Sequence, residues 1–179
     1  MRRKDREITD KQQINAIIEA CDCCRIAFPA EDAPYIVPLN FGYTDDKNKR
    51  TLYFHGAKEG RKIDLINKTD YVGFEMDTNH TPVTAEGTPC SYTFLYSSII
   101  GKGKISLIDS MDEKIEALKI ITRHINPNEK GDISPESAAV AAVFKIEVDE
   151  LSCKEHILIY KRRRSLNVRL TAFLLYLVS

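Results

Sequence analysis

The feature that most constrains the fold is a succession of β-branched and aromatic segments, separated by short polar or glycine-marked breaks. These segments lie at residues 25–28, 35–43, 51–55, 71–77, 91–108 and 138–148. Most of the breaks have hairpin length, which favours an antiparallel sheet. Pro38 lies inside the second segment and predicts an edge or bulged strand, because proline cannot donate to a sheet ladder. The sequence therefore predicts a mainly β fold, and a closed or split barrel fits it better than an open sheet.

Three helical patterns accompany these strands. Thr9 and Asp10 are candidate caps for a first helix that ends near Cys21. Residues 63–68 predict a short helix, and Ser110 begins a capping box for a longer one. A chain of 179 residues is long enough to bury a core as one domain.

The distribution of charge argues against general nucleic-acid binding. The last nineteen residues hold five cations and no acid, so residues 1–160 carry 21 cations against 26 acids. Such binding needs a broad basic face, which an acidic body does not offer. The longest apolar run, residues 171–179, is far shorter than the roughly 20 residues of a membrane helix. We therefore expect no transmembrane segment.

The five cysteines predict reduced thiols rather than disulfides or a metal site. Their number is odd, and the polar first residues do not form a signal peptide, so we expect a cytoplasmic protein. Cys21, Cys23 and Cys24 are crowded together, whereas structural zinc sites pair separated knuckles. We expect no metal ligands, and a zinc-stabilised interaction protein is the alternative.

Residues 53–62, YFHGAKEGRK, predict an anion site. A strand that enters a helix through a glycine turn leaves backbone N–H groups unpaired near the positive end of the helix dipole. The stretch also holds two glycines and three cations: Gly56, Gly60, Lys58, Arg61 and Lys62. A phosphate is the natural ligand, and a surface loop with solvated cations is the alternative. The spacing matches neither a Walker nor a dinucleotide fingerprint.

A phosphate alone would not bind tightly at such a site. Three charge-assisted hydrogen bonds contribute about 5–8 kcal/mol in total, whereas association costs about 4–15 kcal/mol. A flat ring that buries about 200 Å² adds about 5 kcal/mol. The segment 37–40 and the aromatic residues Tyr92, Phe94 and Tyr96 offer contacts to a ring. We therefore expect a ligand with both a phosphate and an aromatic ring.

Five stretches resemble, in this order, the flavin-binding split-barrel superfamily of pyridoxamine 5'-phosphate oxidase-like proteins. They are MRRKDREITD, YIVPLNFGY, TLYFHGAKEGRKIDLI, CSYTFLYSSIIGKGK and FKIEVDEL. The nitroimidazole-resistance branch is the most similar. The resemblance covers residues 1–155 and implies a six-stranded antiparallel split barrel with flanking helices. It also implies a homodimer with FMN in a groove between the subunits.

The resemblance implies a set of cofactor-binding residues. Around the FMN phosphate and ribityl chain it places His55, Gly56, Ala57 and Lys62, with Lys58 and Arg61 beside them. It lines the flavin ring with backbone groups of Pro38, Leu39 and Asn40. Ser97, Ser98 and Ile99 approach from the long β segment, including from the other subunit. His55 is the candidate catalytic residue, and an ordinary strand-end histidine is its alternative.

The expected function is an FMN-dependent oxidoreductase that reduces a small acceptor such as a nitroaromatic. Electrons would come from a nicotinamide or a protein donor. The alternative is a split-barrel module that stores or senses flavin or haem without turnover. Residues 156–179 match neither the substrate segment of the oxidase proper nor the nitroimidazole-resistance branch, so we do not expect pyridoxamine phosphate oxidation. A membrane contact, a dimer-packing helix and a shifted reading frame stay open for this tail.

Overall fold

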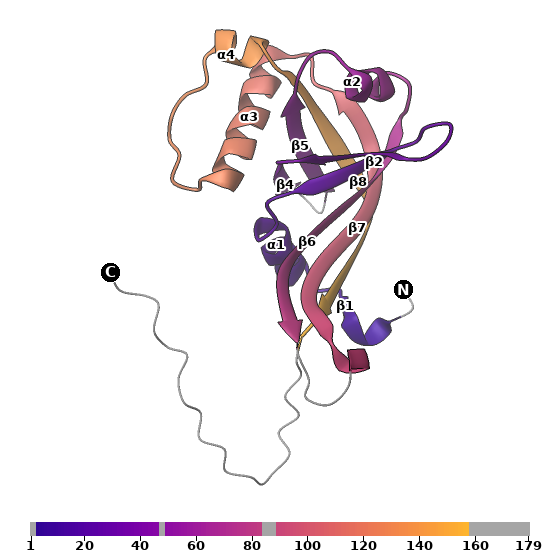
Figure 1. Ribbon diagram of the computed structural model, residues 1–179. Helices are drawn as coiled ribbons and strands as arrows, with labels where there is room; N and C mark the ends of the chain where they lie inside the picture. The colour runs from indigo at the N-terminus through magenta and orange to yellow at the C-terminus, as the bar shows by residue number, and fades with distance from the viewer. Residues whose placement is uncertain (1–2, 47–48, 84–88, 158–179) are drawn as a thin grey trace.

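The computed structural model shows one antiparallel sheet of eight strands that curls around a core, with helices at its flanks (Figure 1). It describes residues 3–46, 49–83 and 89–157. The mainly β fold class is therefore confirmed. Most of the predicted tail, from residue 158 onward, lies outside the described residues. Within the described part of the chain, no helix is both long and apolar enough to span a membrane.

The strands follow the order β3-β2-β6-β7-β8-β5-β4, and β1 pairs with β8. Their bounds are β1 (Glu7–Ile8), β2 (Cys24–Phe28), β3 (Tyr35–Leu39), β4 (Gly42–Asp46), β5 (Lys49–Gly56), β6 (Tyr71–Val83), β7 (Thr93–Leu107) and β8 (Ala142–His156). The two ends of this order, β3 and β4, are joined in the chain by only Asn40 and Phe41. The sheet must therefore curl until its edges meet, as in a split barrel.

The strand count differs from the expected six for two reasons. The predicted strand 35–43 is two strands, because the chain turns at Asn40 and Phe41, and the two-residue β1 was not predicted. Phe41 is fully buried at this turn. A Cβ on Gly42 would lie 2.7 Å from the backbone of Ile120, so glycine lets α3 (Met111–Ile125) press against β4.

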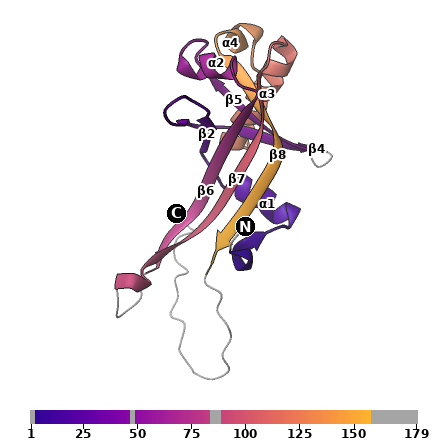
Figure 2. The same ribbon diagram turned by 90° about the vertical axis from the view of Figure 1, so that its right-hand side faces the viewer.

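Two strands, β6 and β8, are much longer than predicted. β6 extends to Val83 and β8 to His156, because each pairs with the long central strand β7 (Figure 2). Part of the predicted last strand is instead a short helix, α4 (Pro135–Ala139). Its cap Ser134 accepts a hydrogen bond from the N–H of Ser137 at 3.2 Å.

Two of the predicted helix caps, Asp10 and Ser110, are confirmed, whereas the other candidate, Thr9, precedes the cap of the first helix. Asp10 accepts a hydrogen bond from the N–H of Gln13 at 2.8 Å at the start of α1 (Lys11–Glu19). Ser110 caps α3 through the N–H of Glu113 at 3.5 Å. The predicted short helix is α2 (Arg61–Ile66), which lies at the end of the barrel where β5 ends (Figure 1).

Aromatic side chains are the largest members of the core, which otherwise consists mostly of isoleucine. The largest fully buried ones are Phe28, Phe41, Phe54 and Phe144. Phe54 and Phe144 stack with ring centroids 5.4 Å apart, and burial of each ring contributes about 1.5–3 kcal/mol. A second, smaller cluster joins Val143 of β8 to Ala117 of α3. Because Val143 and Phe144 point to opposite faces of β8, α3 covers the outer face of the barrel at this level.

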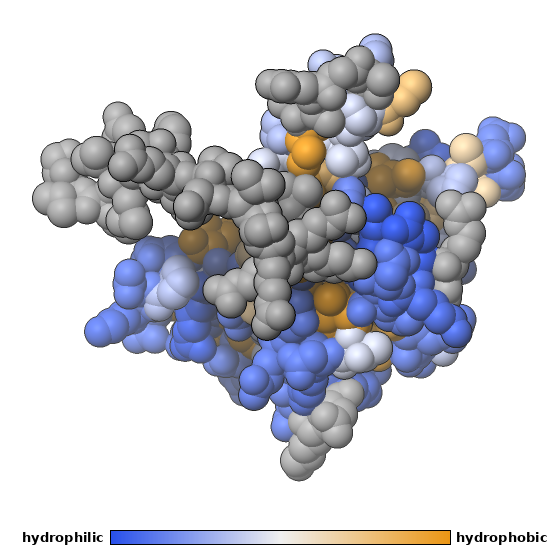
Figure 3. Space-filling model, turned by 90° about the horizontal axis from the view of Figure 1, so that it is seen from below, coloured by the Kyte–Doolittle hydropathy of each residue, from blue (hydrophilic) through white to orange (hydrophobic). Residues whose placement is uncertain are grey.

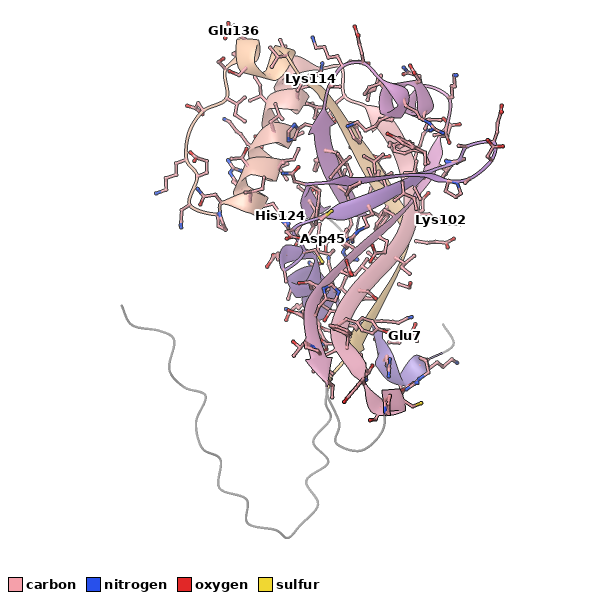
Figure 4. All side chains as sticks on the ribbon, viewed as in Figure 1. Glu7, Asp45, Lys102, Lys114, His124 and Glu136 are labelled. Carbon is pink, nitrogen blue, oxygen red and sulfur yellow. The ribbon has the colours of Figure 1, made fainter. Side chains whose placement is uncertain are left out.

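A charged cluster joins α1 to the β4–β5 hairpin. Asp45 lies below α3 and next to α1 (Figure 4), and only 7% of its side chain is exposed. It accepts a hydrogen bond from Asn15 at 2.9 Å. Lys11 lies 3.1 Å and Arg50 3.5 Å from its carboxylate. Burial opposes ionisation of Asp45, but these hydrogen bonds and charges outweigh it, so its pKa lies below its usual value.

Candidate functional site

The turn between β5 and α2 holds most of the predicted phosphate-binding residues. β5 ends at Gly56, and the exposed turn of Ala57, Lys58, Glu59 and Gly60 leads into α2 at Arg61. Gly60 has φ of 111°, a conformation that favours glycine. Its carbonyl accepts hydrogen bonds from the N–H groups of Ile63 at 2.9 Å and Asp64 at 3.2 Å.

Lys62 folds back over Gly56 and brings its ammonium to the mouth of the barrel. Its Nζ lies 5.5 Å from the centre of the Phe144 ring, and a Cβ on Gly56 would collide with it. Burial lowers the pKa of Lys62. Among the described residues, no carboxylate forms an ion pair with Lys62. A half-buried cation without a counter-ion is a ready site for an anion.

Arg61 points away from Lys62, toward the start of β3. Its guanidinium carbon lies 4.5 Å from the centre of the Tyr35 ring. The first turn of α2 therefore presents two cations in different directions, one over Phe144 and one over Tyr35. Tyr35 and Phe144 were not identified as site residues from the sequence. Both are far from α2 along the chain, and no local pattern links them to it.

His55 lies one residue from Gly56 but faces the other way. It pairs with Val143, which packs under α3, whereas its neighbour Phe54 points into the core. Because side chains alternate along a strand, His55 and Lys62 lie on opposite faces of β5. The backbone of His55 therefore lies next to the β5–α2 turn, whereas its half-buried side chain lies on the α3 side of β5.

The predicted ring-lining residues lie on the edge strand and the turn after it. β3 pairs with β2, with Pro38 opposite Arg25 and Leu39 opposite Cys24. Within the described part of the chain β3 has no other partner strand, which confirms Pro38 as an edge-strand residue. Pro38 and Asn40 are exposed, and Leu39 is half-buried.

The third predicted group lies on the far half of β7. Ser97 is only 1% exposed, donates a hydrogen bond to Glu155 at 3.0 Å and accepts one from Asn79 at 3.3 Å. Ile99 is fully buried, and Ser98 between them is half-buried. Asn79 has φ of 61° and lies in an irregularity of the β6–β7 pairing. This bulge was not predicted from the sequence, although asparagine is among the residues that tolerate this conformation.

The strand register shows that Ser97, Ser98 and Ile99 lie far from the β5–α2 turn of the same chain. Leu107 of β7 lies opposite Phe144, the residue beneath Lys62, and Ser97–Ile99 lie eight to ten residues further along the same strand. At about 3.3 Å per residue the separation is roughly 25–33 Å. A ligand the size of a flavin cannot contact both groups in one chain.

The cysteines form no metal site in the described part of the chain, where no cluster of three or more His, Cys, Asp or Glu side chains could hold an ion. Cys21, Cys24 and Cys153 are buried, and Cys90 is exposed. Burial raises the pKa of Cys21 to about 12 and that of Cys153 to about 11. These buried thiols therefore carry little thiolate at neutral pH.

Comparisons with known proteins agree on one family. Residues 10–155 match the family model described as pyridoxamine 5'-phosphate oxidase. A crystal structure of a candidate 5-nitroimidazole antibiotic resistance protein from Bacteroides thetaiotaomicron is 34% identical, with a TM-score of 0.71 over 83% of this chain and 86% of that chain. A comparison with curated protein sequences finds no match.

Two more distant structures share the fold. The flavocytochrome Anf3 from Azotobacter vinelandii has a TM-score of 0.73 at 19% identity, over 88% of this chain and 72% of its own. The FAD and haem binding protein from Mycobacterium smegmatis has a TM-score of 0.72 at 17% identity, over 84% of this chain and 73% of its own. At these identities the likeness concerns the fold alone.

Proposed function

Because the chain belongs to the pyridoxamine 5'-phosphate oxidase family, as the resemblance of its five stretches predicted, we propose that it is an FMN-dependent oxidoreductase. The acceptor in this proposal is a small nitroaromatic compound. The 34% identical structure, a candidate 5-nitroimidazole resistance protein, supports this choice of acceptor. The observation that carries the proposal is the half-buried ammonium of Lys62, which has no carboxylate partner among the described residues.

The residues at the β5–α2 turn fit the phosphate end of FMN. Lys62 supplies a positive charge, and the absence of a side chain at Gly56 leaves room for it. Ala57, Lys58 and Arg61 extend this surface around the turn. The flavin supplies the redox chemistry when bound, and the protein binds it, orients it and excludes water from it. The resemblance implied His55 as the catalytic residue, but its side chain faces α3 on the opposite face of β5 from Lys62, so in this proposal only its backbone contributes to the site.

The ring of FMN requires a second copy of the chain in this proposal. Ser97, Ser98 and Ile99 lie too far from Lys62 along the strands to share a ligand within one chain. Because Ser97 and Ile99 are buried, a partner would contribute this group through the half-buried Ser98. Large exposed hydrophobic residues on the described surface, including Ile36, Tyr71 and Ile100, offer apolar area for such contact. The view from the end opposite α2 also shows hydrophobic areas between hydrophilic ones (Figure 3). A homodimer with FMN between its subunits is therefore the proposed assembly, with Pro38, Leu39 and Asn40 along the flavin ring.

A flavin- or haem-binding module without turnover is the second candidate. The flavocytochrome and the FAD and haem binding protein share this fold, which favours such a role. The absorbance spectrum of the purified protein separates the candidates. A flavin spectrum that bleaches with a nicotinamide donor and recovers with a nitroaromatic supports the oxidoreductase. A flavin that never bleaches supports the module, and a Soret band indicates haem.

The site assignment has its own test in Lys62→Ala. The substitution removes one charged contact, so the Kd for FMN should rise at least about tenfold. Lys130→Ala is the matched control, because Lys130 is an exposed cation on a distant loop. An unchanged Kd in Lys62→Ala would remove this residue from the site. Flavin fluorescence in a titration with FMN gives both constants.

A further inference from the structure

A groove lies beside the proposed phosphate site, on the other side of Arg61. It measures ≈ 610 Å³ and runs between α2 and the loop that joins β2 to β3. Its walls are residues 29–36 together with Arg61, Leu65 and Lys68. We call it the α2 groove. Its volume is within the range of about 300–1,000 Å³ that small-molecule sites occupy, and FMN bound at Lys62 would not account for it.

One wall of the α2 groove combines two cations with an apolar floor. Arg61 and Leu65 are four residues apart and share a face of α2. Lys68 lines the same groove from the turn that follows α2, and Leu65 is half-buried. The ring of Tyr35 supports the guanidinium of Arg61 at 4.5 Å, which holds this group in place before any ligand binds.

The opposite wall carries exposed carboxylates and small apolar residues. Glu31 and Asp32 contribute the carboxylates, and Ala33 and Pro34 follow them. Among the described residues, neither carboxylate forms an ion pair with Arg61 or Lys68, although all four line one groove. The groove therefore offers donors for a phosphate, acceptors for a diol and an apolar floor for a planar base.

We propose that the α2 groove binds the adenosine monophosphate part of a dinucleotide. Arg61 and Lys68 would hold its phosphate, and Leu65 would underlie the base. The carboxylates of Glu31 and Asp32 would accept hydrogen bonds from the ribose hydroxyls. The inference rests on the proposed function, because Arg61 is adjacent to Lys62.

Two kinds of dinucleotide contain an adenosine monophosphate part. In flavin adenine dinucleotide the adenylate is covalently joined to the flavin, and in a nicotinamide dinucleotide it belongs to a separate electron donor. The experiment uses FMN, FAD and ADP as probes, each titrated into cofactor-free protein, with ADP also titrated into FMN-loaded protein. The test variant is Lys68→Glu, a charge reversal at an exposed residue that Lys62 does not contact, and Lys130→Glu is its matched control.

The expected result is a Kd for FAD at least about tenfold lower than that for FMN, with this advantage lost in Lys68→Glu and kept in Lys130→Glu. ADP binding to the FMN-loaded protein that Lys68→Glu weakens equally supports the groove, and assigns the adenylate to a separate nucleotide. Equal affinities for FMN and FAD, with no binding of ADP, would overturn the inference and leave the proposed flavin function intact. If no flavin binds, the proposed function fails, and ADP binding to the cofactor-free protein still decides whether the groove takes an adenylate.

Discussion

Gly56→Ala tests whether the position of Lys62, rather than its charge alone, makes the phosphate site. A Cβ at residue 56 would collide with Nζ of Lys62 and lie 3.1 Å from its Cε. Both atoms belong to the far end of a flexible side chain, so the lysine can turn away without any movement of the backbone. The substitution therefore separates the site from the fold.

The two effects of Gly56→Ala have different expected sizes. Alanine in a strand gains about 0.5–1 kcal/mol over glycine, and a shifted lysine rotamer costs about 0.5–1.5 kcal/mol. The free energy of unfolding should thus change by less than about 1 kcal/mol, or about 2–4 °C in Tm. Loss of one charge-assisted contact to a phosphate costs about 1.5–3 kcal/mol, so the Kd for FMN should rise about ten- to hundredfold.

Gly103→Ala provides the contrasting variant. A Cβ there would lie 2.9 Å from the backbone carbon of Glu147 and 2.8 Å from Ile146. Because the backbone of β8 cannot turn aside, the free energy of unfolding should fall by about 1–3 kcal/mol. Thermal unfolding gives the stability of each variant, and flavin titration gives its Kd for FMN. An unchanged Kd for FMN in a folded Gly56→Ala protein would refute the claim that Lys62 holds a phosphate from its place over Phe144.

Two further predictions concern the fold and the thiols. Asp45→Asn should lower the free energy of unfolding by about 1–3 kcal/mol at pH 7, as measured in urea. Because the pKa of Asp45 is lowered from 3.8 on folding, this difference should persist above about pH 4 and disappear as the pH falls through the lowered value; a difference that grows in acid would contradict the assigned contacts. At pH 8, iodoacetamide should modify Cys90 in the native protein, and should reach Cys21, Cys24 and Cys153 only after unfolding, because three of these four thiols are buried and their pKa values are raised. Peptide mass mapping checks this order, and early modification of Cys24 would contradict it.

Local signals predicted much of the fold. The caps at Asp10 and Ser110 are read from adjacent residues, because each depends on a hydrogen bond within a few positions. The break of residues 35–43 into two strands was not predictable in this way. It depends on the approach of α3 to Gly42, a contact between segments far apart in the chain. The same holds for the length of β8, which its pairing with β7 sets.

The candidate site was likewise predictable where it depends on local structure, and not where it depends on contacts between distant segments. The sequence places glycines and cations at the β5–α2 turn, because a turn and the first residues of a helix are local structure. It does not reveal that Lys62 lies over Phe144 and Arg61 over Tyr35, since these contacts form only when the barrel closes. Nor does it reveal that His55 faces α3 rather than the barrel mouth, which follows from the pairing of β5 with β8.

The cost of burying Lys62 favours an anion over a neutral ligand at the barrel mouth. Burial lowers its pKa, which means that the folded protein without a ligand disfavours the charged form. Among the described residues no carboxylate offsets this cost, so an anion that binds here both gains a charged contact and removes the penalty. A ligand at a concentration of about 100 times its Kd stabilises a fold by about 2.7 kcal/mol. An anionic cofactor would therefore be part of the stability of this barrel as well as of its chemistry, and a neutral analogue that lacks the phosphate would supply neither contribution.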